Sequence, residues 1–312
     1  MEGPLIGKEA MNRNEDGSKH TVCVAIPTYL REQVLVDTIR QVLDQDPAAD
    51  EVLVIDQTPQ HDAETEEYLA RAEQDGLIRW IRHAPPNLNG ARNRALKETN
   101  CDLLILIDDD VELAPFFIEK HLRNYDDQKV VAVCGRVIQA KGNVSAEGQH
   151  PWLSQFPCKQ YCGWGTERVE GIAGFWGGNH SLRVEVARQF GGFDENFFGP
   201  LYNESDLALR LWKAGRLIVY DPEAELLHLG ASIGGVRNRN KRVPEYWMSF
   251  STVYFHLKHF FPKWYCWKNI LFLQFRKRAL RRDNVFHPWR LPWALISYVY
   301  SFSLAVRICA KG

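Results

Sequence analysis

The sequence predicts an α/β protein with a doubly wound, mostly parallel sheet flanked by helices. Short apolar segments with strand character alternate with longer segments whose apolar residues recur at helical spacing, which is the βαβ pattern of such a sheet. Acidic residues follow two of these strands without a turn between them. A hydrophobic content of 45% in 312 residues is enough to fill a large core.

Each element has its own signal. Segment 31–45 carries apolar residues at helical spacing, and 102–107 is an apolar strand that runs into three aspartates. In the first half, the predicted strands are 21–26, 51–55, 78–82, 102–107 and 130–133, and the predicted helices are 31–45, 62–74, 91–99 and 115–125. In the second half, helices are expected at 183–190 and 204–214, strands at 217–220 and 224–229, and loops over 141–178.

The chain is expected to have three parts. Residues 1–20 are polar and lack an apolar stretch, so a disordered lead-in is expected there and a signal peptide is not. Residues 21–232 are expected to form the α/β domain. Residues 233–312 are basic and aromatic and are expected to form a helical C-terminal appendage.

The composition of the appendage leaves its role open. From Arg237 to Arg282 there are twelve Lys or Arg residues against one acid, Glu245, and twelve aromatic residues lie between Tyr246 and Phe275. This mixture suits an anionic membrane surface or a helical subdomain packed on the main domain. It also suits single-stranded nucleic acid, but no other feature of the sequence supports that partner. The longest apolar run, 291–306, is interrupted by Pro292, so no spanning helix is expected.

Seven cysteines are scattered along the chain and odd in number. Such a distribution predicts no disulfide framework and fits a reducing compartment. A cytoplasmic location is therefore expected, with peripheral attachment to the inner face of the membrane left open.

Three adjacent carboxylates, Asp108, Asp109 and Asp110, end the strand at 102–107. Adjacent carboxylates repel one another and need a cation or solvent. A hard divalent ion held by one or two carboxylates together with substrate phosphates is the usual solution. The alternative is an acidic loop that caps the strand. Because ligands bind beyond the carboxyl ends of parallel strands, the triple and Asp56 are expected at one rim.

Several short motifs occur in an order that is more specific than any one of them. They are Ala25-Ile-Pro-Thr-Tyr29, Val54-Ile-Asp56, Gly90-Ala-Arg-Asn93, the Asp triple, Gly192-Phe-Asp-Glu195, the stretch 203–210, Pro222 and His228. By this ordered set, from about residue 22 to 229, the chain resembles the inverting glycosyltransferases of family 2, which have the A-type glycosyltransferase (GT-A) fold. The resemblance implies a nucleotide-binding half, 21–135, and an acceptor half, 136–232.

The resemblance also implies an activity. It is the transfer of a hexosyl or deoxyhexosyl group from a nucleotide-sugar donor to a hydroxyl of a sugar or lipid-linked acceptor, in bacterial polysaccharide or glycolipid synthesis. The residues implied in donor binding are Pro27, Tyr29, Asp56, Gln57, Arg92, Asp108 and Asp109. Family members usually have an acid where Gln57 stands, which leaves the nucleotide base open. Asp56 is alternatively a cap that orders its loop.

Asp110 is implied as a ligand of Mn²⁺ or Mg²⁺, and His228 as a residue that completes the metal shell. A histidine on an apolar strand is alternatively a core residue. The implied catalytic base is Glu204, which deprotonates the acceptor hydroxyl, with Asp206 as a further candidate. Alternatively, both acids only favour the N-terminus of their helix.

Near the acceptor or donor sugar, the resemblance places Trp176, Gly178 and Asn179. Their alternatives are core packing for Trp176 and a plain turn for the other two.

Two other functions are weighed against sugar transfer. A nucleotidyltransferase needs a basic loop after the first strand, and the stretch 27–33 offers only Arg31. A non-catalytic sugar-nucleotide-binding or membrane scaffold protein would not need the Asp triple and Glu204. The sequence has no complete phosphate-binding glycine motif of the GxxxxGK[ST] or GxGxxG type.

Overall fold

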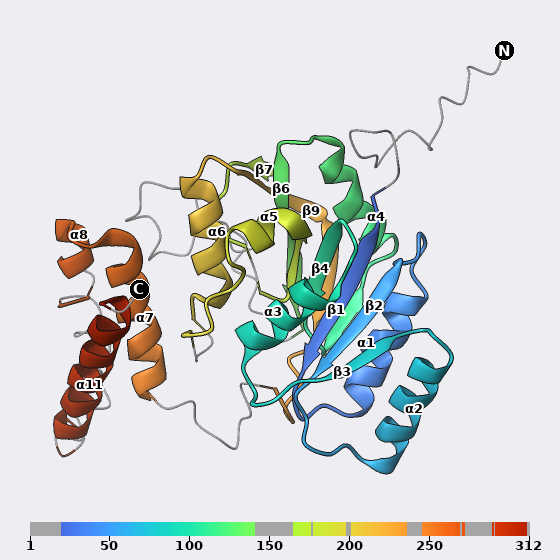
Figure 1. Cartoon of the computed structure of the whole chain (residues 1–312), viewed down its shortest axis with the longest axis horizontal. Helices are drawn as coiled ribbons and strands as arrows, with labels where there is room; N and C mark the ends of the chain where they lie inside the picture. The colour runs from blue at the N-terminus through green and yellow to red at the C-terminus, as the bar shows by residue number, and fades with distance from the viewer. Residues whose placement is uncertain are drawn as a thin grey trace.

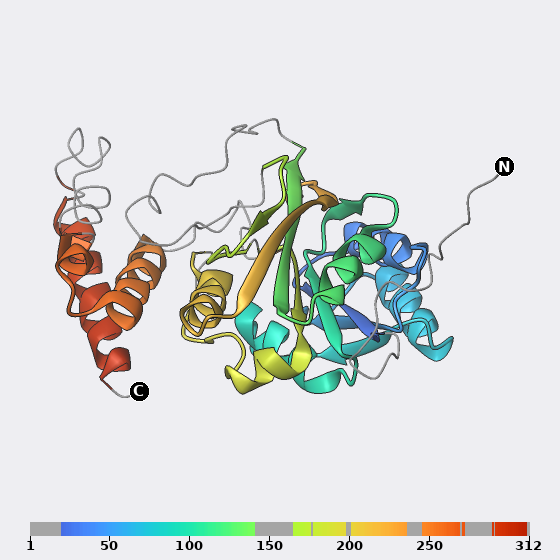
Figure 2. The ribbon, with the colours of Figure 1, turned by 90° about the horizontal axis from the view of Figure 1, so that it is seen from above.

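A computed structural model describes residues 20–140, 165–175, 177–197, 201–235, 245–268, 270–271, 289 and 291–310. The predicted lead-in and most of the predicted loop over 141–178 lie outside these residues. One nine-stranded sheet forms the centre of the α/β domain, and helices cover both its faces (Figure 1). The C-terminal helices form a separate layer on one side of it (Figure 2).

The first half of the sheet is parallel, as predicted. Its strands have the order β3-β2-β1-β4, and all neighbouring pairs in this group are parallel. The strands are β1 (Val22–Thr28), β2 (Glu51–Asp56), β3 (Arg79–Arg82) and β4 (Leu103–Ile107), connected by α1 (Gln33–Leu43), α2 (Ala63–Gln74) and α3 (Leu88–Glu98). Their carboxyl ends therefore meet at one rim, which is the rim with Asp56 and the Asp triple.

The second half adds antiparallel pairs that the sequence did not predict. Strand β8 (Asn179–Arg183) lies antiparallel between β4 and β6 (Val130–Gln139). Beyond β6, strand β9 (Leu217–His228) is parallel to β6 and antiparallel to both β5 (Val111–Leu113) and β7 (Val169–Glu170). The helices of this half are α4 (Phe117–Leu122), the 3-10 helix η2 (Arg123–Asp126), α5 (Val184–Gln189) and α6 (Asn203–Lys213).

Strand β9 corrects one prediction. Two strands were expected around Pro222, but the chain forms one twelve-residue strand. The pairing with β6 skips at this point, since Gly135 pairs with Asp221 and Arg136 with Glu225. A proline without an N–H is tolerated in such an irregularity, so it does not end the strand.

The core has two parts, one on each face of the sheet. Alternate residues of β1 point to opposite faces: Val22, Val24 and Ile26 belong to one cluster, and Cys23 and Ala25 to the other. The first cluster includes residues of α1, α2 and α4, and the second includes residues of α3, α5 and α6. The five cysteines in the described part of the chain are all free thiols.

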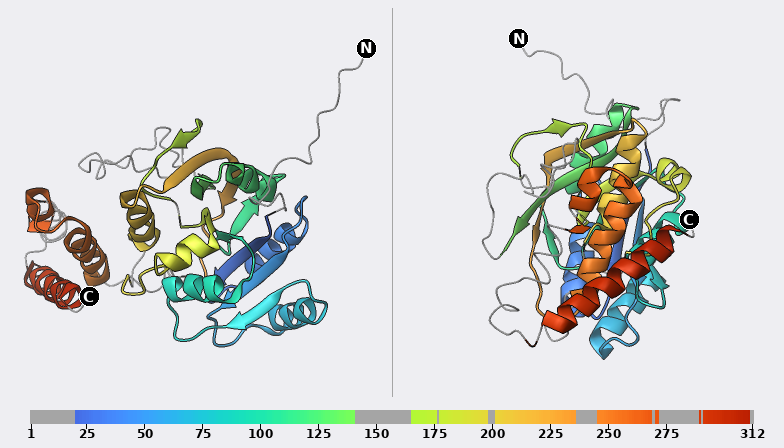
Figure 3. Two further views of the ribbon diagram at one scale, coloured as in Figure 1. Left: turned by 45° about the horizontal axis from the view of Figure 1, so that its top comes forward. Right: turned by 90° about the vertical axis from the view of Figure 1, so that its left-hand side faces the viewer.

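The C-terminal layer contains α7 (Glu245–Phe260), α8 (Trp264–Trp267) and α11 (Leu291–Cys309). Helix α7 lies between α6 and α11 (Figure 3). A third core cluster joins Leu209 of α6 and Phe197 to Phe250 and Phe255 of α7. Helix α7 therefore packs on the main domain through its aromatic residues.

Helix α11 corrects a second prediction. By length and composition it is long and apolar enough to cross a membrane, and only 17% of its most apolar window is buried. Pro292 was expected to interrupt this segment. It instead stands in the first helical turn, where the missing N–H has no partner to lose.

Candidate functional site

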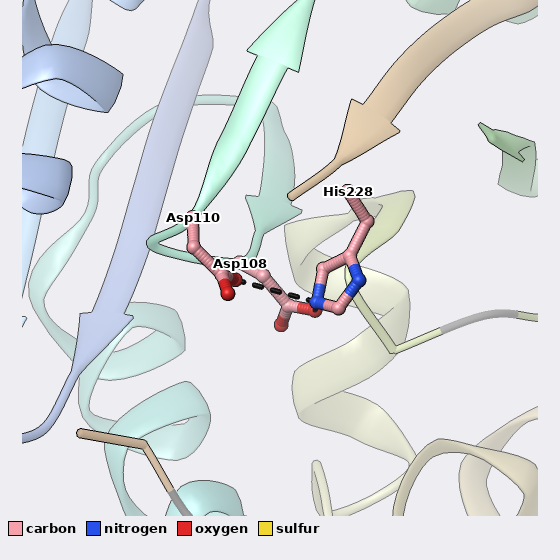
Figure 4. A group of neighbouring side chains, drawn as sticks. All are labelled: Asp108, Asp110 and His228. Carbon is pink, nitrogen blue, oxygen red and sulfur yellow. Dashed lines mark ion pairs between the residues drawn. The ribbon is translucent and has the colours of Figure 1, made fainter. Parts of the chain in front are cut away.

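The three aspartates connect β4 to β5 at the rim of the sheet. Val111 follows them and pairs directly with His228, the last residue of β9. The backbone N–H of Leu229 also donates to the carbonyl of Asp110, 2.9 Å away. Sheet register thus places the imidazole of His228 beside Asp108 and Asp110, as Figure 4 shows.

These three side chains form a candidate metal site. The Nε2 atom of His228 lies 3.3 Å from Oδ1 of Asp110 and 3.8 Å from Oδ2 of Asp108. Each residue offers one ligand atom, and these atoms lie within 4.8 Å of one another. The other ring nitrogen, Nδ1, lies 2.9 Å from Oε1 of Gln139, which orients the ring. Two carboxylates and an imidazole suit a divalent ion of the Mn²⁺ class, so the donor set fits.

Arg31 is the cation inside this cluster, and sequence reasoning missed its role. Its Nη2 lies 3.1 Å from Oδ2 of Asp110, and its Nε lies 3.1 Å from Oδ1 of Asp109. The guanidinium also donates to the carbonyls of Ala231 and Ile233. The available signal was that buried carboxylates need a positive partner, and Arg31 is the one basic residue between Pro27 and Gln33.

The two neighbouring aspartates differ in their pKa. Burial raises the pKa of Asp109 to about 7, although Arg31 and the Thr28 hydroxyl, 2.8 Å away, act in the opposite direction. Burial alone would also raise the pKa of Asp110, but His228 and Arg31 outweigh it and lower that pKa. Asp110 is therefore the more persistent anion, and Asp109 is directed toward Thr28 and Arg31 within the protein.

Asp56 is surrounded by donors from the protein. Its carboxylate accepts from the Thr58 N–H at 2.8 Å, the Trp80 indole at 2.9 Å and Arg82 at 2.8 Å, and it lies 3.0 Å from Nε2 of His61. With 1% of its surface exposed, it orders the loop after β2. Its alternative role as a cap thus has direct structural support.

The other residues predicted near the nucleoside lie at the ends of β1 and β2. Pro27 and Tyr29 are partly exposed. The carbonyl of Tyr29 accepts from the N–H of Gly235 at 2.7 Å, so the segment after β9 covers this end of β1. Gln57 is buried and accepts from the N–H of Asn87 at 2.6 Å.

A second charged pair faces the segment before β8. Nη1 of the buried Arg92 lies 3.7 Å from Oε2 of Glu204, the second residue of α6. Nη2 of Arg92 donates to the carbonyl of Gly177 at 3.1 Å. A Cβ on Gly177 would come within 2.6 Å of that same nitrogen and 3.1 Å of Glu204 Oε2. Gly177 therefore allows the backbone to pass directly over this pair.

Gly178 connects this pair to the metal site. A Cβ on Gly178 would overlap the carboxylate of Asp108, so only glycine lets the backbone pass there. Asn179 instead points into the sheet: it is fully buried, donates to the carbonyls of Arg136 and Ala224, and lies 2.9 Å from Nε2 of His121. These contacts make Asn179 a bridge between strands. Trp176 lies outside the described residues.

Asp206 faces away from this site, toward the C-terminal layer. It is fully buried and pairs with Arg210 of its own helix at 2.8 Å. From α7, Lys258 and His259 each lie 2.8 Å from its Oδ1. Burial would raise the pKa of Asp206, but these three neighbours hold it well below the usual range. Its contacts hold α7 against α6, whereas Glu204 lies beside Arg92.

Residues 23–189, more than half of the chain, match the family described as "Glycosyl transferase family 2". This chain belongs to glycosyl transferase family 2. As a member of the family it is a glycosyltransferase, and the predicted family and fold are confirmed. A comparison of its sequence with curated proteins gave no significant match.

Three solved structures are similar to this family 2 chain. GalNAc-T7 with UDP, GalNAc and Mn²⁺ has 15% identity and a TM-score of 0.54; the match covers 67% of this chain but only 44% of that one. The mannosyltransferase PcManGT from Pyrobaculum calidifontis, in complex with GDP-Man and Mn²⁺, has 16% identity and a TM-score of 0.55, with 98% and 83% covered. S. aureus TarS 1-349, in complex with UDP-GlcNAc, has 11% identity and a TM-score of 0.61, with 92% and 81% covered. At these identities the likeness shows the GT-A fold.

Proposed function

We propose that this glycosyltransferase moves a sugar from a nucleotide-sugar donor to an acceptor hydroxyl with inversion, using a divalent ion held by Asp108, Asp110 and His228. The observation that carries the proposal is the convergence of these three ligand atoms within 4.8 Å at the rim where β4 ends. The nucleotide sugars and Mn²⁺ in the similar structures support it. Mg²⁺ has the same preference for oxygen ligands and is the alternative ion.

A divalent ion bound at this site would stabilise the negative charge that develops on the departing nucleoside diphosphate. The protein supplies the remaining parts. Arg31 pairs with Asp109 and with Oδ2 of Asp110, which leaves Oδ1 of Asp110 facing His228. Arg92 places a second positive charge near the glycine segment, where it can contact donor phosphates.

Glu204 is the proposed base. It belongs to the first turn of α6, its side chain is 19% exposed, and Arg92 lies 3.7 Å away. The carboxylate of Glu204 can accept the proton of an acceptor hydroxyl. The hydroxyl oxygen then forms the bond to the anomeric carbon as the bond to the diphosphate oxygen breaks, so the sugar is inverted and no covalent enzyme intermediate forms.

The nucleotidyltransferase alternative loses support from the position of Arg31. That reaction needs a basic loop after the first strand, and the guanidinium of Arg31 is already bound to Asp109 and Asp110. A non-catalytic scaffold is distinguished by donor hydrolysis: metal-dependent release of the nucleoside diphosphate without acceptor contradicts it.

The decisive experiment compares Glu204→Gln with Glu185→Gln. Both glutamates are second residues of their helices, and Glu185 is exposed on α5. We expect Glu204→Gln to retain metal-dependent binding of a nucleoside diphosphate, measured by thermal shift across a panel of bases, and to lose turnover by a factor of ~100 or more. Glu185→Gln should match the unsubstituted enzyme. Near-full turnover of Glu204→Gln would refute the base assignment.

We further propose that the acceptor is a sugar or a lipid-linked sugar in polysaccharide or glycolipid synthesis, and that the enzyme works in the cytoplasm at the inner face of the membrane. The free thiols in the described part of the chain support a reducing compartment. A comparison of the transfer rates to lipid-linked and to soluble sugar acceptors tests the acceptor class.

A further inference from the structure

Helix α11 has two different faces. The side toward α7 contains Tyr298, Ser301 and Ala305, which are between 0% and 7% exposed. The opposite side consists of large hydrophobic residues at spacings of three, four and seven, which places them on one helical face. Their exposed fractions are Trp293 71%, Ile296 58%, Val299 62%, Tyr300 57% and Val306 41%.

This outer face is not covered within the described part of the chain. A helix that is apolar all round is expected to be covered on both sides, yet α11 is covered only toward α7. Of the twelve exposed large hydrophobic residues in the described ranges, nine lie between Phe261 and Val306. An apolar surface of this kind marks a contact with a partner or a membrane.

The charge distribution indicates which partner. Residues 237–312 contain 15 Lys or Arg and only two acidic residues, whereas residues 1–236 contain 23 basic and 37 acidic residues. Helix α11 itself has no acidic residue, and Arg307 lies in its last turn. Tryptophan and tyrosine prefer the headgroup level of a bilayer, and anionic lipids attract nearby Lys and Arg. A basic segment with an aromatic outer face fits an anionic membrane surface.

We propose that the outer face of α11, defined by Trp293, Ile296, Val299, Tyr300 and Val306, docks in the plane of an anionic lipid bilayer. The in-plane orientation follows from the inner face of the helix. Tyr298 and Ala305 share a buried cluster with α7 and with Leu209 of α6. A spanning orientation would expose this cluster, and an in-plane orientation keeps it intact.

The docking surface is attached firmly to the catalytic domain. Lys258 and His259 of α7 bind Asp206 of α6, and Lys258 also lies 2.6 Å from Asp194. Helix α6 carries Glu204 two residues before Asp206. Membrane docking through α11 would therefore fix the position of the acceptor side relative to the bilayer. Docking is measured without donor or metal, so its test is independent of the sugar-transfer chemistry.

Co-sedimentation of the full chain with vesicles tests the proposal. We expect binding to phosphatidylcholine vesicles that contain phosphatidylserine, and weaker binding to pure phosphatidylcholine or in high salt. The double variant Trp293→Ser/Tyr300→Ser should bind at least tenfold more weakly, since it removes two large apolar groups. The control is Leu77→Ser, because Leu77 is 50% exposed but lies between α2 and β3. All variants should keep the same metal-dependent donor hydrolysis, which shows that they fold.

Three results would overturn the proposal. One is the absence of vesicle binding, and another is unchanged binding by the double variant. The third is a stable dimer in light scattering that the double variant converts to a monomer, which would make a second copy the partner of α11. A Tyr300→Glu variant provides an independent substitution if the double variant does not fold. Release from vesicles at alkaline pH is expected of the in-plane orientation, and retention contradicts it.

Discussion

Arg31 binds one carboxylate oxygen of Asp110 and leaves the other toward His228. Nη2 of Arg31 lies 3.1 Å from Oδ2 of Asp110, and Oδ1 of the same carboxylate lies 3.3 Å from Nε2 of His228. The N–H of Ala231 donates to Oδ2 as well, at 2.8 Å. One oxygen of Asp110 is thus held by the protein and the other faces the metal site. Arg31 balances a cluster of buried carboxylates before any cation binds.

Replacing Arg31 by alanine should therefore destabilise the metal-free enzyme. Removal of one partner of a buried ion pair leaves an uncompensated charge, and we expect a loss of about 3 kcal/mol in the free energy of unfolding. Mn²⁺ should restore part of this loss, because the ion supplies the missing positive charge. Urea denaturation with EDTA and with Mn²⁺ measures both effects. Arg40→Ala is the matched control, since Arg40 is exposed and pairs with Asp37 on the surface. Equal losses in the two variants would contradict the role of Arg31.

Gly178→Ala should weaken metal binding. A Cβ at this position overlaps the carboxylate of Asp108 and forces it to move, so we expect at least tenfold weaker Mn²⁺ affinity by isothermal titration calorimetry. Gly76→Ala is the control, because a Cβ on Gly76 meets nothing within 4 Å. Alanine there causes only the backbone strain of a positive φ, without a clash. That variant should lose stability and keep its metal affinity. Unchanged affinity in Gly178→Ala would separate Asp108 from the metal site.

The first half of the fold was predictable because its signals are local. The apolar run of β4 ends directly in Asp108, and parallel strands bring their carboxyl ends to one rim, so the metal rim follows from sequence alone. The second half was not, because antiparallel β8 is specified by partners far along the chain: Leu104 pairs with Leu182. No local periodicity records such a pairing.

The site shows the same division. Asp110 and His228 were predicted from an ordered set of motifs, and the register of β5 with β9 brings them together. Arg31 reaches Asp110 across 79 residues, after Leu30 turns the chain with a φ of 55°. A left-handed turn at leucine has no sequence signal, so the direction of the Arg31 side chain could not be read in advance. The structural role of Asp206 could not be predicted either, because its partners Lys258 and His259 belong to α7.

Asp206→Asn should distinguish a structural carboxylate from a catalytic one. Asp206 is buried among Arg210, Lys258 and His259, so we expect a loss of about 3 kcal/mol in unfolding free energy and retained turnover at a temperature where the variant is folded. The folded-state pKa of Asp206 lies below its ordinary value of 3.8. Its contribution is therefore fully present above pH 3.8 and is lost as the pH falls through the lower folded-state value. A hundredfold loss of turnover in the folded variant would instead make Asp206 the base.

His121 should make the stability of the fold depend on pH in a higher pH range than Asp206 does. Its ring bridges Ser181 and Asn179 on β8, with 2.9 Å to each, and burial lowers its pKa from 6.5 to about 4. The unfolded chain binds a proton between these two values and the folded chain does not. The stabilising effect is therefore complete above pH 6.5 and is lost as the pH falls toward 4, by about 3 kcal/mol in total.

The variant His121→Gln removes this titration. We expect it to be less stable than the unsubstituted enzyme at pH 7, since glutamine cannot bridge both partners in the same way. As the pH falls from 7 to 4, the difference in unfolding free energy between the two proteins should shrink by about 3 kcal/mol, because only the unsubstituted chain loses the contribution of His121. Urea denaturation at half-unit pH steps measures this difference, and a difference that does not change with pH would show that the His121 ring is not held in its neutral form by the fold.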